Sequence, residues 1–261
     1  MIGIREEVVE VKGNKHFINE YNMDKSVIER ISETINSPTV ECLDFIPGYT
    51  AVINDFLTQI EVDSILEDTS NQKWVPVGLD GILSHYTSGD PIGSYRLSCY
   101  EPDLANALWN RLAPYLPSER VFNEYSHTDY DGAVKWKPVG INPLFRFIKY
   151  LEDGALVPHY DGPFIESDER RSLSTLVMYF TDNKKGGTRF LHDPQSKLPF
   201  TKRDFSDWTV TAKTEDITHV IEPTRGKALI FDHRILHDSE PMGHDKTEKM
   251  IIRADIMYEK V

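Results

Sequence analysis

The sequence predicts an α+β protein in which a β-rich second half is buttressed by helices from the first half. Helix signals concentrate before residue 114, where capping residues precede amphipathic segments. After residue 143, short runs rich in β-branched and aromatic residues follow one another, separated by Gly, Pro, Asp and Asn. Many short strands after a helical half favour a sandwich or jelly roll with helices packed on it.

Three helices are expected in the first half. Residues 24–35 have apolar side chains at helical spacing, with Asp24 as the N-cap. Thr58 and Glu61 form an S/T-x-x-E capping box before the second helix, and Pro102 opens the third. The apolar side chains of the first helix are Val27, Ile28, Ile31 and Ile35.

Most of the strands are expected in the second half, with some strand around 42–54 and 93–100. Two polar segments, 122–140 and 193–217, are expected to be irregular and to act as lids or binding loops. The strands predicted in the second half are 144–150, 172–181, 187–192, 219–223, 227–232 and 249–258.

The domain organisation predicted from these patterns has three parts. Residues 1–40 form an N-terminal extension without an assigned role, 41–140 form a helix-rich support region, and 141–261 form the β-rich core. The support region and the core are expected to make one continuous domain, because 261 residues with 39% apolar content are enough for a single large core.

Composition restricts the partners that this chain can have. Lys and Arg number 29 and Asp and Glu number 42, which gives a formal charge of −13, so nucleic acid is a poor default partner. Two cysteines, Cys42 and Cys99, are too few for a disulfide framework. The first 20 residues have no apolar signal region, and no apolar run reaches the roughly 18 residues of a membrane span. A soluble, cytoplasmic protein without membrane contact is the simplest expectation, and the oligomeric state is left open.

The stretch PHYDGPF, residues 158–164, contains the first candidate site. His159 and Asp161 are two residues apart, so in extended chain their side chains lie on one face. Imidazole and carboxylate both bind divalent first-row metals, and His237 in RILHDSEP supplies a possible third ligand. Because strand parity places His233 on the same face as His237, His233 is the rival, and the H-x3-P spacing favours His237.

The last predicted strand, KMIIRADIMY, separates charge from apolar residues. Lys249, Ile251 and Arg253 share one face, and the alternating residues from Met250 onward share the other. The two cations either face solvent or, if they point into a barrel, require an anionic partner, because a buried unpaired charge is costly.

Taken together, these motifs resemble those of the Fe(II)/2-oxoglutarate dioxygenases, in particular the prolyl 4-hydroxylase-like branch. The resemblance covers roughly residues 140–259. It is carried by the order Y-x8-H-x-D from Tyr150, STLVMYF, GGTRF, H-x3-P from His237 and K-x3-R-x-D-x-M-Y from Lys249. It implies a double-stranded β-helix (jelly roll) core.

The resemblance also implies roles for individual residues. His159, Asp161 and His237 would hold Fe(II), leaving coordination positions for 2-oxoglutarate and O2. Lys249 would bind the distal carboxylate of the 2-oxoglutarate co-substrate. The segment from His237 to Lys249 is slightly longer than the family's usual spacing, so Arg253 remains an alternative for this role. Two tyrosines would lie near the co-substrate, and these are Tyr150 and Tyr179.

Three functions are compatible with these observations. The preferred one is hydroxylation of an aliphatic C–H group in a prolyl residue or a similar peptide position. The second is the same chemistry on a free amino acid or another small metabolite, and the third is a non-catalytic, cupin-like metal-binding protein. Halogenation is disfavoured because Asp161 is present where halogenating relatives have a small residue.

Overall fold

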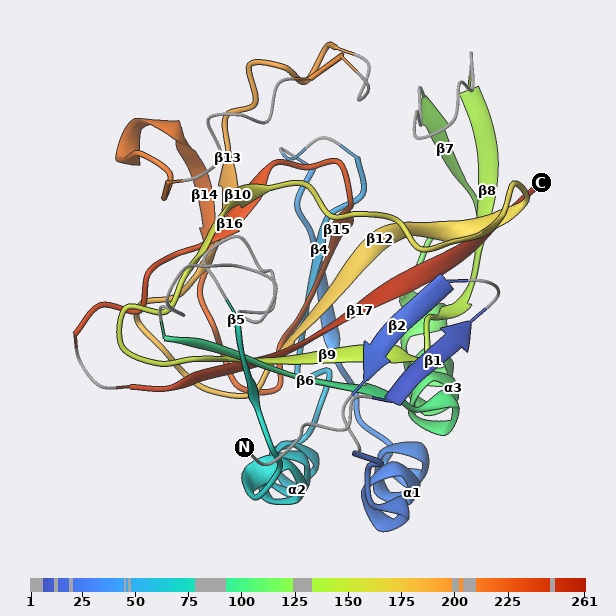
Figure 1. Cartoon of the computed structure of the whole chain (residues 1–261). Helices are drawn as coiled ribbons and strands as arrows, with labels where there is room; N and C mark the ends of the chain where they lie inside the picture. Colours follow the sequence, from blue (N-terminus) through green and yellow to red (C-terminus); the bar gives the residue numbers. More distant parts are fainter. Residues whose placement is uncertain are drawn as a thin grey trace.

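The structure is a computed structural model, and it describes most of the chain. The described residues are 7–11, 14–18, 21–44, 46, 48–77, 93–123, 133–198, 202–203, 210–244 and 247–261. Two antiparallel β-sheets and three α-helices make up the greater part of these residues (Figure 1). Within them, no helix is both long enough and apolar enough to cross a membrane.

The larger sheet contains eleven of the strands in the described ranges, and it runs through both halves of the chain. Its main path has the order β3-β4-β15-β12-β17-β9-β6-β5, while β11, β7 and β8 join at the sides. The strands are β3 (Thr39–Cys42), β4 (Ala51–Asn54), β5 (Val75–Val77), β6 (Ser94–Tyr100), β7 (Arg120–Asn123), β8 (Ala133–Ile141), β9 (Leu144–Tyr150), β11 (Ile165–Ser167), β12 (Arg170–Tyr179), β15 (Ala228–Asp232) and β17 (Lys249–Lys260).

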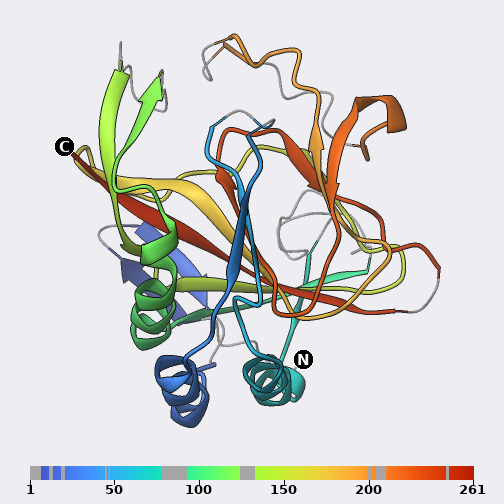
Figure 2. The same ribbon diagram turned by 180° about the vertical axis from the view of Figure 1, so that it is seen from behind.

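The smaller sheet has four strands in the order β10-β16-β13-β14, all antiparallel. It lies on the side of the large sheet that faces away from the helices (Figures 1 and 2). The two sheets form the jelly roll that was expected from the sequence, so the predicted fold class is confirmed. The four strands are β10 (Leu156–His159), β13 (Thr188–Leu191), β14 (Ile217–Ile221) and β16 (His237–Ser239).

Helices α1 (Lys25–Glu33), α2 (Gln59–Ser70) and α3 (Pro102–Leu112) pack side by side against the large sheet (Figure 2). The side chain of Asp24 caps α1, as expected. The N-terminal strands β1 (Glu7–Val11) and β2 (Asn14–Ile18) form a separate hairpin. Two 3-10 turns complete the elements, at Ala113–Tyr115 and Thr214–Asp216.

The large sheet buries apolar side chains on both faces. On one face, alternating β17 residues such as Ile252 and Ala254 pack with the helices in the main core. On the other face, Ile251 packs with Val177 and Phe231 in a second core between the two sheets. β17 lies between β12 and β9 in the large sheet. Its side chains point alternately toward the core beneath the helices and toward the space between the two sheets.

The expectation for the segment 122–140 differs from the structure. The segment 122–140 was expected to be irregular, but β7 and β8 form a hairpin across it and Trp136 on β8 is buried in the main core. In β8 the exposed Lys135 and Lys137 flank the buried Trp136, so the polar residues make the strand alternation hard to recognise in the sequence. The predicted boundary between the support region and the core, at 140/141, lies within β8, and the expectation of one continuous domain stays a prediction.

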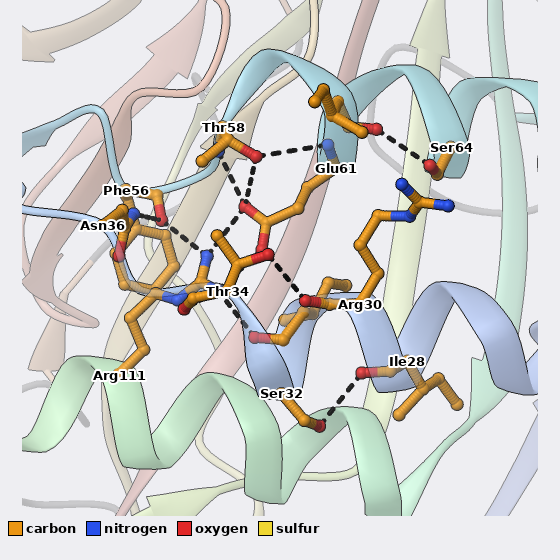
Figure 3. A network of polar contacts seen from close by, with 12 residues as sticks. Ile28, Arg30, Ser32, Thr34, Asn36, Phe56, Thr58, Glu61, Ser64 and Arg111 are labelled. Atoms are coloured by element: carbon orange, nitrogen blue, oxygen red, sulfur yellow. Dashed lines mark hydrogen bonds and ion pairs between the residues drawn. The ribbon is translucent and has the colours of Figure 1, made fainter.

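A buried carboxylate joins the three helices. Glu61 completes the capping box of α2 by accepting a hydrogen bond from the backbone N of Thr58 at 2.7 Å. Glu61 is fully buried and also accepts two hydrogen bonds from the guanidinium of Arg111 on α3, at 2.6 and 2.9 Å. The same guanidinium donates to the carbonyl of Ile31, near the end of α1, at 2.6 Å. Figure 3 shows the Glu61 side chain between Thr58 and Arg111. One ion pair therefore ties together the helices that support the sheet.

We expect Glu61→Ala to lower the free energy of unfolding by about 3–5 kcal/mol, because it leaves the Arg111 cation buried without its partner. Chemical denaturation followed by far-UV circular dichroism measures this change. Glu67→Ala on the exposed face of the same helix is the matched control and should change stability by less than about 0.5 kcal/mol. Equal effects of the two substitutions would contradict the assigned role of Glu61.

Candidate active site

The two candidate histidine ligands face each other across a pair of strands. His159 ends β10 and His237 begins β16, and the antiparallel register places the two residues directly opposite one another. Their ring centroids are 4.2 Å apart. Asp161 follows in extended chain, and its backbone N donates to the carbonyl of His233 at 2.9 Å. Strand pairing thus brings together residues that are far apart in the sequence.

Both imidazoles are held with Nε2 directed toward Asp161. The Nδ1 of His159 lies 2.8 Å from the carbonyl of Val157, and the Nδ1 of His237 lies 2.9 Å from the carbonyl of Ile235. A carbonyl only accepts, so Nδ1 carries the proton and Nε2 keeps its lone pair, the tautomer that a metal requires. The two Nε2 atoms each lie 3.7 Å from an oxygen of Asp161.

The donor set fits a divalent first-row metal ion. One ligand atom from each of His159, Asp161 and His237 lies within 4.8 Å of the others. Burial and the nearby His159 lower the pKa of His237 to about 3, so its ring is neutral and available as a ligand. Two imidazoles and one carboxylate on one side of an ion leave the opposite positions open, as in the facial triad of non-haem Fe(II) enzymes.

A hydrogen-bond chain holds the carboxylate of Asp161. Burial would raise the pKa of Asp161, but the Arg253 guanidinium, 3.0 Å away, and the imidazoles keep it well below its usual range. The hydroxyl of Thr175 donates to the other carboxylate oxygen in a short hydrogen bond. Thr175 on β12 was not selected from the sequence, although it lies on the same face of the strand as the predicted Tyr179.

His233, the rival ligand, lies behind the candidate metal site. It is fully buried, with Nδ1 2.9 Å from the Thr175 hydroxyl and Nε2 2.9 Å from the Ser172 hydroxyl. The parity argument that placed it with His237 was wrong, because β15 ends at Asp232 and a turn precedes β16. His233 therefore supports Asp161 through Thr175 and through its own carbonyl.

A cavity extends from these three residues between the two sheets. Its apolar walls come from five strands of the two sheets. Its polar lining includes Asp161 and Arg253, which contact each other, and Lys249 and Ser239, which also contact each other. Because Lys249 and Arg253 are four residues apart on β17, about 13 Å along the strand, these two polar groups lie at separate ends of the cavity. The apolar wall residues are Ile148, Leu156, Val177, Phe231 and Ile251.

The far end of the cavity is formed around Lys249. This side chain is 1% exposed, and its Nζ donates to the carbonyl of Gly186 at 2.6 Å and to the hydroxyl of Ser239 at 2.5 Å. Gly186 has φ +79°, and a Cβ there would lie 2.4 Å from the sulfur of Met242, so glycine is required for this close approach. Burial lowers the pKa of Lys249 to about 7. Both acceptors are neutral, and within the described residues no carboxylate forms an ion pair with Lys249, so an anion in the cavity could pair with this cation.

The two predicted tyrosines have different positions. Tyr150 lines the cavity and lies under Lys249, whose Nζ is 4.0 Å from the ring centroid. Burial raises the pKa of Tyr150 to about 12, so the hydroxyl stays protonated. Tyr179 is fully buried, and its hydroxyl shares a 2.7 Å hydrogen bond with Thr188, which lines the cavity. Ser239, two residues after His237 on β16, was missed, although strand parity could have found it.

Other candidate residues lie away from the cavity centre or outside the described residues. Arg189 pairs with Asp238 through two hydrogen bonds, at 2.8 and 2.5 Å, so this carboxylate neutralises an arginine and does not join His237. Tyr125, His127 and Tyr130, proposed as a cover for the pocket, and Trp208 lie outside the described residues, as does His85.

Comparison with known families identifies the β-rich core. Residues 145–254 match the family model of the 2OG-Fe(II) oxygenase superfamily. These residues form a 2OG-Fe(II) oxygenase core. The resemblance predicted from the sequence is therefore confirmed for residues 145–254, which include His159, Asp161 and His237, and the cofactors of this superfamily are Fe(II) and 2-oxoglutarate with O2 as co-substrate. No curated protein matches the chain.

Several solved structures resemble this chain at low identity. The viral collagen prolyl hydroxylase of Paramecium bursaria Chlorella virus-1, solved with 2-oxoglutarate, is 16% identical, with 82% of this chain and 97% of that chain covered and a TM-score of 0.47. A Pseudomonas putida prolyl-4-hydroxylase is 12% identical, with 89% and 97% covered and a TM-score of 0.42. HygX from Streptomyces hygroscopicus, solved with nickel and 2-oxoglutarate, is 11% identical, with 80% and 82% covered and a TM-score of 0.45.

Proposed function

We propose that this oxygenase hydroxylates an aliphatic C–H group, with His159, Asp161 and His237 as the Fe(II) ligands and Lys249 as the residue that binds the distal carboxylate of the 2-oxoglutarate co-substrate. The observation that carries the proposal is the placement of the three donors and the buried Lys249 at opposite ends of one apolar-walled cavity. A dicarboxylate with an apolar middle matches this arrangement, because a buried cation binds a carboxylate with charge-assisted hydrogen bonds.

The overall reaction consumes the substrate R–H, O2 and 2-oxoglutarate and yields R–OH, succinate and CO2. Bound Fe(II) supplies the activation of O2. The protein's residues orient the co-substrate between Lys249 and the metal, hold Asp161 through Thr175, and exclude water with apolar walls. Tyr150 closes the cavity beside Lys249 through the contact of its ring with the ammonium group. Tyr179 contributes indirectly, because its hydroxyl is hydrogen-bonded to Thr188, which lines the cavity.

Succinate release in the presence of Fe(II), 2-oxoglutarate and O2 tests this function. The substrate panel contains proline-containing peptides, as the preferred class predicted from the sequence, and free amino acids as the second class. We expect 2-oxoglutarate-dependent succinate formation that rises when a substrate is present. A protein that binds Fe(II) but forms no succinate under any condition would instead be the cupin-like metal-binding protein considered as an alternative.

A further inference from the structure

A β-bulge lies in strand β12, behind the candidate metal site. Ser172 pairs with Met257 of β17, and Ser174 pairs with the adjacent residue, Ile256, so β12 has one extra residue between these two pairs. In a regular strand, residues three apart such as Ser172 and Thr175 point to opposite faces. A bulge redirects a side chain by one position, so here both hydroxyl groups can reach the same neighbour.

That neighbour is the imidazole of His233. Its Nδ1 lies 2.9 Å from Oγ1 of Thr175, and its Nε2 lies 2.9 Å from Oγ of Ser172. The Thr175 hydroxyl donates in turn to the carboxylate of Asp161, and Oγ of Ser172 accepts a hydrogen bond from the backbone N of Phe164 at 2.7 Å. A chain of hydrogen bonds thus begins three residues after Asp161 and ends on its carboxylate.

The two ends of the chain fix the direction of every hydrogen bond in it. The carboxylate of Asp161 only accepts, so Thr175 uses its hydrogen there and accepts from Nδ1–H of His233. The backbone N of Phe164 only donates, so the Ser172 hydroxyl directs its own hydrogen to Nε2. Within the described residues no carboxylate forms an ion pair with His233, and complete burial favours the neutral ring. His233 is therefore the neutral tautomer with its proton on Nδ1.

Further contacts hold both ends of the segment from Asp161 to Phe164. The backbone N of Asp161 donates to the carbonyl of His233 at 2.9 Å, and the backbone N of Ser172 donates to the carbonyl of Phe164 at 2.8 Å. The carboxylate oxygen of Asp161 that Thr175 does not contact lies 3.0 Å from the guanidinium of Arg253. Rotation of the carboxylate would break its contacts on both oxygens, so the protein fixes the orientation of this candidate ligand.

We propose that His233 is a positioning residue of the metal centre, which acts through Thr175 to orient the Asp161 carboxylate and thereby raises the affinity of the site for a divalent metal ion. The inference rests on the ligand set of the proposed function. Residues that hydrogen-bond to metal ligands commonly contribute about 10- to 100-fold to metal affinity, because they fix the orientation of the ligand. The bulge in β12 is part of this arrangement, since it brings Ser172 to the second nitrogen of the same ring.

Calorimetric titration with Mn(II) compares the wild-type protein with two variants of Thr175. Thr175→Val nearly keeps the shape of the side chain but loses the hydroxyl, and it should weaken Mn(II) binding by about 10- to 100-fold. Thr175→Ser keeps the hydroxyl and should recover most of this affinity. Wild-type affinity in Thr175→Val, or equal losses in both variants, would overturn the inference and leave the proposed function intact. Wild-type protein that bound no Mn(II) would instead refute the ligand set itself.

A double-variant cycle tests whether His233 acts through Thr175. His233→Leu should weaken Mn(II) binding to a similar extent as Thr175→Val, because both remove support from the same carboxylate. Combining the two substitutions should cause little further loss, since residues that act through one hydrogen-bonded chain are not additive. If the two losses added in full, His233 would act independently of Thr175 and the inference would fail.

Ser174→Ala is the matched control for a general loss of stability. Ser174 is adjacent to Thr175 on β12 and is equally buried, and its hydroxyl contacts Asp232 and Tyr258 on the opposite face of the strand. The variant should be less stable in chemical denaturation but should bind Mn(II) as the wild-type protein does. A loss of Mn(II) affinity as large as that of Thr175→Val would show a purely structural effect and would contradict the role of His233.

The tautomer of His233 provides a readout that does not depend on metal affinity. Nitrogen chemical shifts measured by NMR distinguish a protonated ring nitrogen from an unprotonated one, and the signal that is lost in His233→Leu assigns the residue. We expect His233 to carry its proton on Nδ1 near neutral pH, both without metal and with Zn(II), while the Nε2 signals of His159 and His237 shift when Zn(II) binds. A proton on Nε2 of His233 would reverse the chain of hydrogen bonds and overturn the inference.

Discussion

Replacement of His159, Asp161 or His237 by alanine is expected to abolish Fe(II) binding and to reduce succinate formation to the level without enzyme. The three side chains supply the donor atoms that lie within 4.8 Å of one another, and two remaining ligands cannot hold the ion in an open facial site. The fold should persist, because these side chains lie at one edge of the inter-sheet cavity and the main core packs against the helices. Metal content after equilibrium dialysis and far-UV circular dichroism measure the two parts of the expectation.

His244→Ala is the matched control for the ligand variants. His244 is 79% exposed and lies beside Glu152 and Asp153, away from the cavity lining. Its replacement should leave metal content and turnover unchanged. Full metal content with normal turnover in any one of the three ligand variants would remove that residue from the proposed ligand set.

Lys249→Ala is expected to raise the KM for the co-substrate 2-oxoglutarate on the order of 10²-fold or more, while Fe(II) binding changes little. Truncating one partner of a buried charge pair costs about 2–5 kcal/mol, and each 1.4 kcal/mol is a factor of ten in affinity. Lys185→Ala is the control, because Lys185 is adjacent to the same glycine turn but is 60% exposed and pairs with Glu240. An unchanged KM in Lys249→Ala would transfer the role to Arg253.

The buried position of Lys249 also makes co-substrate binding depend on pH. Burial holds the pKa of the free Lys249 ammonium at about 7, whereas a bound carboxylate favours the charged form and raises that pKa. Binding above pH 7 therefore requires uptake of a proton, so the affinity for 2-oxoglutarate should be constant below about pH 7 and fall by up to tenfold per pH unit above it. Lys249→Met should bind weakly without this pH dependence. Calorimetric titration of the Mn(II)-loaded protein with 2-oxoglutarate checks both.

Local signals in the sequence were sufficient for the helices and most strands. The helix starts are marked by residues that act within one helical turn, so they can be recognised from the sequence alone. These residues are the Asp24 cap, the Thr58–Glu61 capping box and Pro102. The alternation likewise predicted that Lys249, Ile251 and Arg253 share one face of β17, because side chains in a strand alternate whatever its partners are, and the structure turns this face toward the cavity.

The supporting residues of the site could not be found in this way. Thr175, His233 and Ser172 contact one another across a turn and between strands, and their hydrogen bonds depend on where β15 ends. Hydroxyl groups are common in strands, so their residue types alone do not separate a support of the metal site from an ordinary buried polar residue. The hairpin of β7 and β8 was missed for a related reason, since its inward positions are separated by charged residues.

The sequence by itself determined the fold class, the family resemblance of the β-rich core and a short list of candidate residues for the metal and the co-substrate, because these depend on residue type and local spacing. Only the tertiary structure decided that His237 and not His233 faces His159, that Lys249 closes the far end of the cavity, and that Arg253 lies at the metal end beside Arg146. The physical reason is strand register. A shift of one residue in pairing turns every side chain to the opposite face, and register is fixed by long-range packing that local sequence does not encode.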